Sequence, residues 1–195
     1  MKHFFSKHGR VIIPIAALGV VALILATILY TVYFSSLDYR AAQIADDVAY
    51  LARVFDDIER TAGIAGFDYQ KNRIDFLNIK KDGFVGSEVG SLNLKEPKKW
   101  QGPYSKEIAT FNEEDYMVVK TNQGYFIVPA DGTVLANGKT IGIDIILDEH
   151  ADINAMMIND HQLAHKGKSL AAKINVGEGY RMTDEKKLVI PENGD

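Results

Sequence analysis

The sequence predicts an α+β fold in which a transmembrane helix continues into a long amphipathic helix, packed on a small antiparallel β-sheet. Three observations indicate this class. Residues 11–34 form an uncharged apolar run, residues 37–58 repeat apolar side chains at helical spacing, and residues 115–147 alternate strand-like segments with turn residues. Without the anchor and its leader, about 160 residues remain, which is enough for one domain with its own core.

The run from Val11 to Phe34 contains no charged side chain, and its threonines can bond their own backbone. As a helix it would cover about 36 Å, more than the ~30 Å hydrocarbon core of a bilayer. We therefore predict a transmembrane helix over 11–34, in contact with the lipid bilayer. A cleaved signal peptide is the competing interpretation. The length of the run and the aromatic residues at its end favour an uncleaved anchor.

The charges beside this run predict its orientation. Residues 1–10 form a basic leader, with Lys2, Lys7 and Arg10 and no acidic residue. By the positive-inside rule the N-terminus is cytoplasmic, so the rest of the chain lies outside. We predict a single-pass protein of a bacterial inner membrane, with its C-terminal domain in the periplasm.

Composition excludes several classes of site. The formal net charge is −4, so no basic field favours a nucleic-acid partner. The chain has no cysteine, which excludes disulfide staples, thiolate metal sites and a cysteine nucleophile.

Residues 35–66 are predicted to form the second, periplasmic half of the long helix. Apolar residues recur there at spacings of three and four, no proline falls between Pro14 and Gly63, and Gly63 and Gly66 are expected to end the helix. We expect its apolar face to pack on the following domain and to serve in assembly with other copies or partner helices; a coiled-coil stalk is the alternative. The residues of this face are Ile44, Val48, Leu51, Phe55 and Ile58.

Residues 67–176 are predicted to form the α+β domain. Residues 73–79 suggest a short strand or helical turn, and residues 92–104 should form an irregular loop, because Pro97 and Pro103 each remove a backbone donor. Within this loop we expect Trp100 and Tyr104 to cover the edge of a small core, with Gly102 allowing the backbone to turn. Ligand stacking by Trp100 is the alternative.

The second part of this domain is predicted to hold the sheet. Residues 116–121 and 125–128 should form a hairpin, followed by strands over 133–135 and 140–147. A helix from Asp148 to about Lys166, capped by Asp148 and ended by Gly167, should come next. Residues 177–195 are predicted to form a flexible tail.

The tetrad Trp100, Gly102, Pro103 and Tyr104 forms a W-x-G-P-Y motif between the helical part and the sheet. With the basic start, the apolar helix and the amphipathic helix 42–58, the chain resembles the major pseudopilins of type II secretion systems, within the type IV pilin-like family, over residues 10–128. It lacks the family's cleavage motif and fifth-position glutamate: Arg10 follows Gly9, and Pro14 stands at the fifth position.

The resemblance implies a pilin-like fold and a structural role in a type II secretion or pilus-like system, with self-association or with pseudopilin-like and other secretion-system partners. It implies no enzymatic activity. The alternative is a membrane-tethered periplasmic module that binds or senses a small ligand or an envelope partner, with a pocket near the W-x-G-P-Y loop.

No motif predicts catalysis or a cofactor. His161 and His165 have the spacing of a metalloprotease helix, but Gln162 stands where the catalytic glutamate belongs. The spacing of Asp148, His150, Asp152 and Asn154 imitates a calcium loop without its turn glycine or its distal glutamate, so calcium stays an alternative. Residues 137–140, Asn-Gly-Lys-Thr, lack the first glycine of a phosphate loop.

Overall fold

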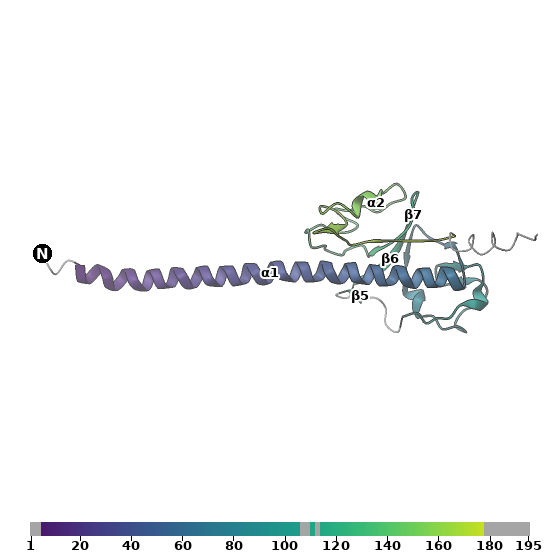
Figure 1. The fold of residues 1–195 in the computed structure, drawn as a ribbon, viewed down its shortest axis with the longest axis horizontal. Coiled ribbons are helices and arrows are strands. Elements are labelled where there is room, and N and C mark those ends of the chain that lie inside the picture. The colour runs from purple at the N-terminus through teal and green to yellow at the C-terminus, as the bar shows by residue number, and fades with distance from the viewer. Residues whose placement is uncertain (1–4, 106–109, 112–113, 178–195) are drawn as a thin grey trace, which may run out of the picture. The chain divides into compact units, whose positions relative to one another are not determined.

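The computed structural model describes residues 5–105, 110–111 and 114–177. It is α+β, with one long N-terminal apolar helix and small antiparallel sheets (Figure 1). The chain divides into two compact units, Met1–Arg40 and Ala41–Asp195. Helix α1 (Phe5–Thr61) begins in the first unit and ends in the second.

The first unit consists of the apolar part of α1. In the described part of the chain, one helix is long and apolar enough to cross a membrane, with a mean hydropathy of 2.1 and none of its most apolar window buried. Thr27 Oγ1 donates to the carbonyl oxygen of Leu23, and Thr31 Oγ1 to that of Thr27, both at 2.8 Å, as the sequence predicts. Residues 1–4 of the predicted leader lie outside the described residues.

Helix α1 ends where the backbone turns left-handed. Its last residue is Thr61, and Gly63 has a φ of 64°. The amide of Gly63 donates to the carbonyl oxygens of Ile58 and Glu59, both at 3.1 Å, so these carbonyl groups of the last turn have a partner. The prediction that Gly63 ends the helix is confirmed. Gly66, the second expected stop, lies instead in strand β1 (Ile64–Phe67).

The described residues of the second unit form three antiparallel sheets, ordered β1-β4-β3, β10-β7-β6-β2 and β8-β9, with β5 paired to β6. The remaining strands are β2 (Lys71–Arg73), β3 (Glu88–Val89), β4 (Leu92–Leu94), β5 (Thr110–Phe111), β6 (Glu114–Thr121), β7 (Gly124–Pro129), β8 (Ala164–His165), β9 (Lys168–Ser169) and β10 (Ala172–Ile174). Two 3₁₀ turns, η1 (Asp75–Asn78) and η2 (Pro97–Lys99), complete the part before the hairpin.

The predicted hairpin is confirmed as β6 and β7, which pair from Tyr116 opposite Pro129 to Thr121 opposite Gly124. The strands expected over 133–135 and 140–147 are wrong. That region is a compact loop held by two isolated bridges, Val134 with Thr140 and Ile141 with Ile145. Strand β10 adds to the other side of β7, from a segment for which no strand was predicted.

The helix predicted from Asp148 to Lys166 is wrong in length, since α2 covers only Ile153–Met156. Asp152 rather than Asp148 caps it, by accepting a bond of 3.0 Å from the amide of Ala155. Asp148 and Asn159 each accept a bond from the amide two residues later, and such local bonds compete with a helical backbone. His161 and His165 therefore lie in a turn and in β8, not on one helix face.

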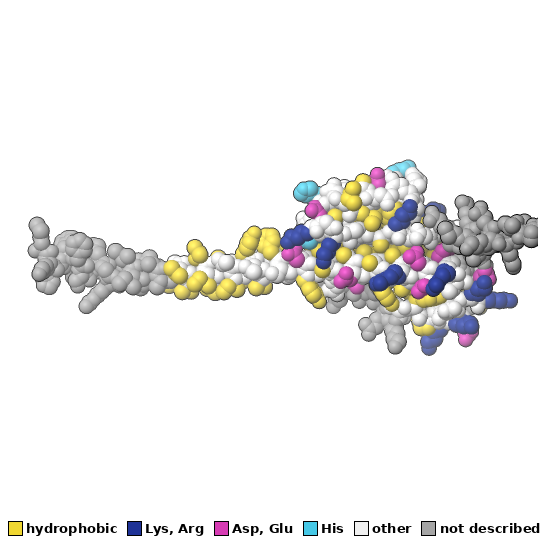
Figure 2. All heavy atoms as spheres, viewed as in Figure 1, with side chains coloured by type: hydrophobic (Ala, Val, Ile, Leu, Met, Phe, Trp, Pro, Cys, Tyr) yellow, Lys and Arg dark blue, Asp and Glu magenta, His cyan; other side chains and the backbone are white. Residues whose placement is uncertain are grey.

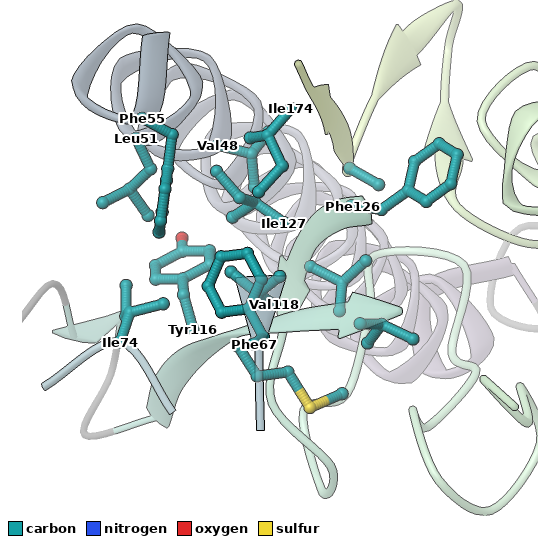
Figure 3. Packing of buried hydrophobic residues seen from close by; sticks show 14 of the residues in the cluster. Val48, Leu51, Phe55, Phe67, Ile74, Tyr116, Val118, Phe126, Ile127 and Ile174 are labelled. Carbon is teal, nitrogen blue, oxygen red and sulfur yellow. The ribbon is translucent and has the colours of Figure 1, made fainter. Parts of the chain in front are cut away.

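The core of the second unit lies between α1 and the sheet that contains β6, β7 and β10. Figure 3 shows Val48, Leu51 and Phe55 of α1 facing side chains of these strands and of β1. Phe55 contacts Phe67 and Phe76, each with ring centroids 6.0 Å apart. This packing fixes the end of α1 against the loops that follow it.

Candidate functional site

The W-x-G-P-Y motif is built around a tryptophan with no exposed surface. Trp100 Nε1 donates a 3.0 Å hydrogen bond to the carbonyl oxygen of Ile79. Its ring meets Tyr104 and Phe84 edge-on, at centroid distances of 4.7 and 6.2 Å. A side chain enclosed in this way offers no face for stacking on a ligand, which supports the packing role expected for Trp100.

The backbone of the other motif residues passes close to this ring. A Cβ atom on Gly102 would lie 2.5 Å from the carbonyl oxygen of Ile79 and 2.5 Å from Trp100 Nε1, so only glycine fits. The Gly102–Pro103 peptide bond is cis. The amide of Tyr104 donates to the carbonyl oxygen of Leu77 at 2.8 Å. The motif therefore wraps residues 77–79.

The irregular loop predicted for residues 92–104 begins later than expected. Its first part is strand β4, which pairs with β1 and β3, and its second part is the 3₁₀ turn η2. The amides of Lys95 and Glu96 donate to the carbonyl oxygens of Gly63 and Ala62, at 2.9 and 2.8 Å. The segment that leads into the motif thus provides hydrogen-bond donors for these two carbonyl oxygens, which lie just past the end of α1.

An open depression of about 550 Å³ lies beside the motif. One wall belongs to the loop 80–86 and the other to η2, and the lining residues are Lys81, Asp82, Phe84, Gly86, Pro97 and Lys98. Trp100 holds the two walls together, because it directly follows η2 and its indole donates to Ile79, which directly precedes the loop. We call this hollow the lysine depression.

Basic side chains surround the lysine depression, although the whole chain carries a net charge of −4. Lys99 pairs with Glu96 at 2.7 Å, and Lys95 lies 3.7 Å from Glu59. Among the residues that the structure describes, Lys81 and Lys98 have no acidic partner at ion-pair distance. Their charges are therefore available to a partner. Figure 2 shows Lys and Arg side chains spread over the visible face of the second unit, among Asp and Glu side chains.

The five residues predicted for the assembly face of α1 lie inside the second unit. Ile44, Val48, Leu51, Phe55 and Ile58 are each at most 2% exposed. They pack in the core of their own domain, so this face is occupied without another copy. The exposed residues on the opposite side form what we call the outward stripe: Gln43, Asp46, Tyr50, Arg53, Asp57 and Arg60.

Glu59 is a buried carboxylate that joins three segments. Its Oε2 accepts a 2.6 Å bond from the amide of Ile64, and its Oε1 accepts a 3.0 Å bond from the amide of Gly177. Gly177 is the one residue of the predicted tail 177–195 that is described; residues 178–195 lie outside the described residues. Lys95 adds a charge partner on the same carboxylate. Glu59 thus connects the end of α1 to β1 and to the segment after β10.

The described residues bring together no group of three histidine or acidic side chains able to hold a metal ion. Three members of the calcium-like run instead make local or cross-loop contacts. Asp148 and Asp152 bond nearby amides, and His150 Nδ1 lies 3.1 Å from Asn122 Nδ2. In the turn at residues 137–140, Asn137 accepts from the amide of Lys139 at 3.0 Å, and its Nδ2 donates to the carbonyl oxygens of Asp160 and Gln162 at 3.0 and 2.9 Å.

Sequence reasoning expected a pocket near the W-x-G-P-Y loop only under the alternative function, and it missed the lysines of the depression and the role of Glu59. The signal for the depression is a pair of dilysines, each beside turn residues, at residues 80–83 and 97–99. No family model, curated protein or solved structure matches this chain. Its function is therefore inferred from α1, the W-x-G-P-Y loop and the depression.

Proposed function

We propose that this chain is a membrane-anchored, pseudopilin-like structural component of a type II secretion or pilus-like assembly. The observation that carries the proposal is that the two parts of α1 have different surroundings. Its large apolar side chains from Leu18 to Phe34 are exposed, while the residues from Ala41 to Thr61 supply one face of the core of an α+β domain. A helix used in this way suits a subunit whose folded domain is held at a bilayer.

The W-x-G-P-Y loop is the second support. Trp100, Gly102 and Tyr104 each make a contact that fixes the loop, and each is a residue of the motif that the pseudopilin family shares. The loop also lies between the helical part and the hairpin β6–β7, as the resemblance implies. We extend the proposal to a pilin-like arrangement of helix and sheet.

The proposed location is a bacterial inner membrane, with the N-terminus in the cytoplasm and the second unit in the periplasm. Lys2, Lys7 and Arg10 before the apolar run support this orientation. In the assembly, copies of the chain would associate through the outward stripe and the lipid-facing part of α1, because the apolar face of the second half is filled by its own sheet.

Cysteine labelling tests the anchor and its orientation without background, since the chain has no cysteine of its own. In intact cells, a membrane-impermeant maleimide should label Lys98→Cys but not Ser6→Cys. Alkaline carbonate should leave the full chain in the membrane pellet, and deletion of residues 11–34 should release it. Release of the full chain by carbonate, or labelling of Ser6→Cys alone, would contradict the proposal.

A second candidate function is a tethered module that binds an envelope partner. The lysine depression favours it, because two unpaired lysines flank an apolar surface beside a rigid loop. The two roles are compatible, since the depression and the outward stripe involve different residues.

A further inference from the structure

We propose that the lysine depression is a docking site for an extended acidic peptide segment of a partner protein, in which acidic residues alternate with apolar ones. This inference rests on the second candidate function, and it does not require self-association.

The openness of the depression suits a segment that lies across a surface rather than a small molecule, which is usually enclosed by its site. The depression is open to solvent and has a volume of about 550 Å³. Its walls are the loop 80–86 and the 3₁₀ turn η2, which face each other across it. A peptide lying in it would contact both walls at once.

The lining combines cationic and apolar groups. Lys81 and Phe84 line one wall, and Pro97 and Lys98 line the other. Lysine ammonium groups form charge-assisted hydrogen bonds with carboxylates, and the aromatic and proline surfaces favour apolar side chains. Asp82 is the acidic residue of the lining, and it would disfavour a segment of uninterrupted acids. An alternation of acidic and apolar residues fits this lining best.

Val85 adds an apolar contact at the rim. It is 96% exposed and lies between the two lining residues Phe84 and Gly86. An isolated exposed valine is ordinary, but this one stands between two residues of the lining, so we expect a bound segment to cover it.

The depression is held in shape before any partner arrives. The indole of Trp100 bonds Ile79 at the start of one wall, and Phe84 packs edge-on against the same ring. In the other wall, the amide of Lys99 donates to the carbonyl oxygen of Glu96 at 2.9 Å, and that of Trp100 to Pro97 at 3.1 Å. A site that needs no ordering on binding retains more of its interaction energy. The W-x-G-P-Y loop would then have a function beyond packing, because it sets the distance between the two walls.

The test is peptide binding by the full chain in phosphatidylcholine nanodiscs. The probe is a synthetic peptide of alternating glutamate and leucine, and binding is followed by titration calorimetry and by the fluorescence of Trp100, the sole tryptophan. We expect saturable binding that weakens as salt is raised. Lys81→Glu combined with Lys98→Glu should lower the affinity at least tenfold. The control, Lys139→Glu with Lys168→Glu, makes the same charge change at exposed sites elsewhere and should stay within twofold.

Two further comparisons separate this site from a charge-only surface. Val85→Asp alters a side chain that packs on nothing, so it should weaken binding without unfolding the chain. A peptide of alternating glutamate and glycine should bind at least fivefold more weakly than the leucine peptide. Equal affinity for the two peptides, or equal affinity of the wild type and the Lys81/Lys98 variant, would overturn the proposal.

Anionic lipid is the competing source of negative charge. Binding to phosphatidylglycerol vesicles that depends on Lys81 and Lys98, without binding of the leucine peptide, would also overturn the proposal. None of these results depends on whether copies of the chain associate, so failure here is distinguishable from failure of the pseudopilin-like role.

Discussion

The hydroxyl group of Tyr116 donates a 2.8 Å hydrogen bond to Oδ2 of Asp47, which ties strand β6 to helix α1. Burial raises the pKa of Asp47 above its ordinary value of 3.8, the bond from Tyr116 lowers it, and the neighbouring charge of Asp46 raises it again. The net shift is upward. The folded state therefore binds this proton more tightly than the unfolded chain does, and the charged form of Asp47 destabilises the fold.

This shift predicts the effect of Asp47→Asn on stability. As the pH rises from below 3.8 through the raised pKa of Asp47, the free energy of unfolding of the wild type falls. That of the variant does not fall for this reason, because asparagine does not ionise. We expect the variant to be more stable near neutral pH, by less than about 1 kcal/mol because water screens this half-exposed group. The gain should vanish well below pH 3.8, where the carboxyl is protonated in both states. Thermal unfolding across this pH range checks it, and a variant less stable than the wild type at neutral pH would contradict the assignment.

Removing the hydroxyl group tests the other half of the same contact. Tyr116→Phe keeps the buried ring and should cost about 1 kcal/mol, the usual net value of one hydrogen bond. It should also raise the pKa of Asp47 further, because it removes the one contribution that lowers it. The carboxyl resonance of Asp47 in an NMR titration measures this directly. An unchanged pKa would mean that the bond does not form in solution.

Trp100→Ala should lower the free energy of unfolding by about 3 kcal/mol or more, since it removes a large side chain with no exposed surface. Trp100→Phe separates volume from hydrogen bonding, because it keeps a ring but loses the donor to Ile79. We expect it to cost less than alanine. Chemical denaturation of both variants gives the comparison. A negligible loss for Trp100→Ala would show that the ring is not enclosed.

Gly102→Ala should destabilise the chain although it adds only one methyl group. The new Cβ would meet a backbone oxygen at 2.5 Å, and backbone cannot move aside as a flexible side chain can. We expect a loss of about 1–3 kcal/mol, as for other overpacked sites. Gly66→Ala serves as a control for the loss of a glycine, because its φ, like that of Gly102, is not positive and the nearest atom to its added Cβ is the hydroxyl oxygen of Tyr125, at 4.0 Å. An equal or greater loss at Gly66 would contradict the steric account.

Much of the helix and the hairpin could be predicted because their signals are local. The spacing from Ile44 to Ile58 and the glycine at 63 indicate α1 and its end, and the turn before Gly124 indicates β6–β7. The long helix expected after Asp148 failed for a local reason as well. Asp148 and Asn159 each accept a bond from the amide two residues later, which competes with a helical backbone, and Asp152 caps a helix that begins only at Ile153; apolar spacing alone does not reveal these bonds.

The rest of the site depends on contacts between distant residues. Strand β10 is identified by its pairing with β7, which its own sequence does not indicate. The role of Glu59 depends on the bonds that it accepts from the amides of Ile64 and Gly177. The tetrad at Trp100 was visible in the sequence, but its bond to Ile79 and the hollow between two dilysine segments were not. Sequence spacing did predict that the apolar face from Ile44 to Ile58 packs on the domain, but it could not say that this packing leaves the same face unavailable to other copies.

Glu59→Gln should be destabilising even though it preserves size. A carboxylate that accepts bonds from two amides would become a side chain with one acceptor oxygen and one donor group, which leaves a buried amide without its partner. We expect a loss of about 1–3 kcal/mol. Asp57→Asn on the exposed side of the same helix is the control and should cost little, because its pair with Arg60 is open to water. Similar losses for the two variants in thermal unfolding would contradict the role of Glu59.

The central claim, that this chain is an assembly subunit whose contacts use the outward stripe, is tested most directly by cysteine crosslinking in native membranes. The chain has no cysteine, so each introduced thiol is unique within its copy. Tyr50 is 48% exposed, and Tyr50→Cys should give covalent dimers with a short bis-maleimide. Lys139→Cys, which is exposed on a different loop, should give far fewer. If Asp46→Cys, Tyr50→Cys and Arg53→Cys all stay monomeric in membranes that retain the full chain, the assembly role proposed here is contradicted.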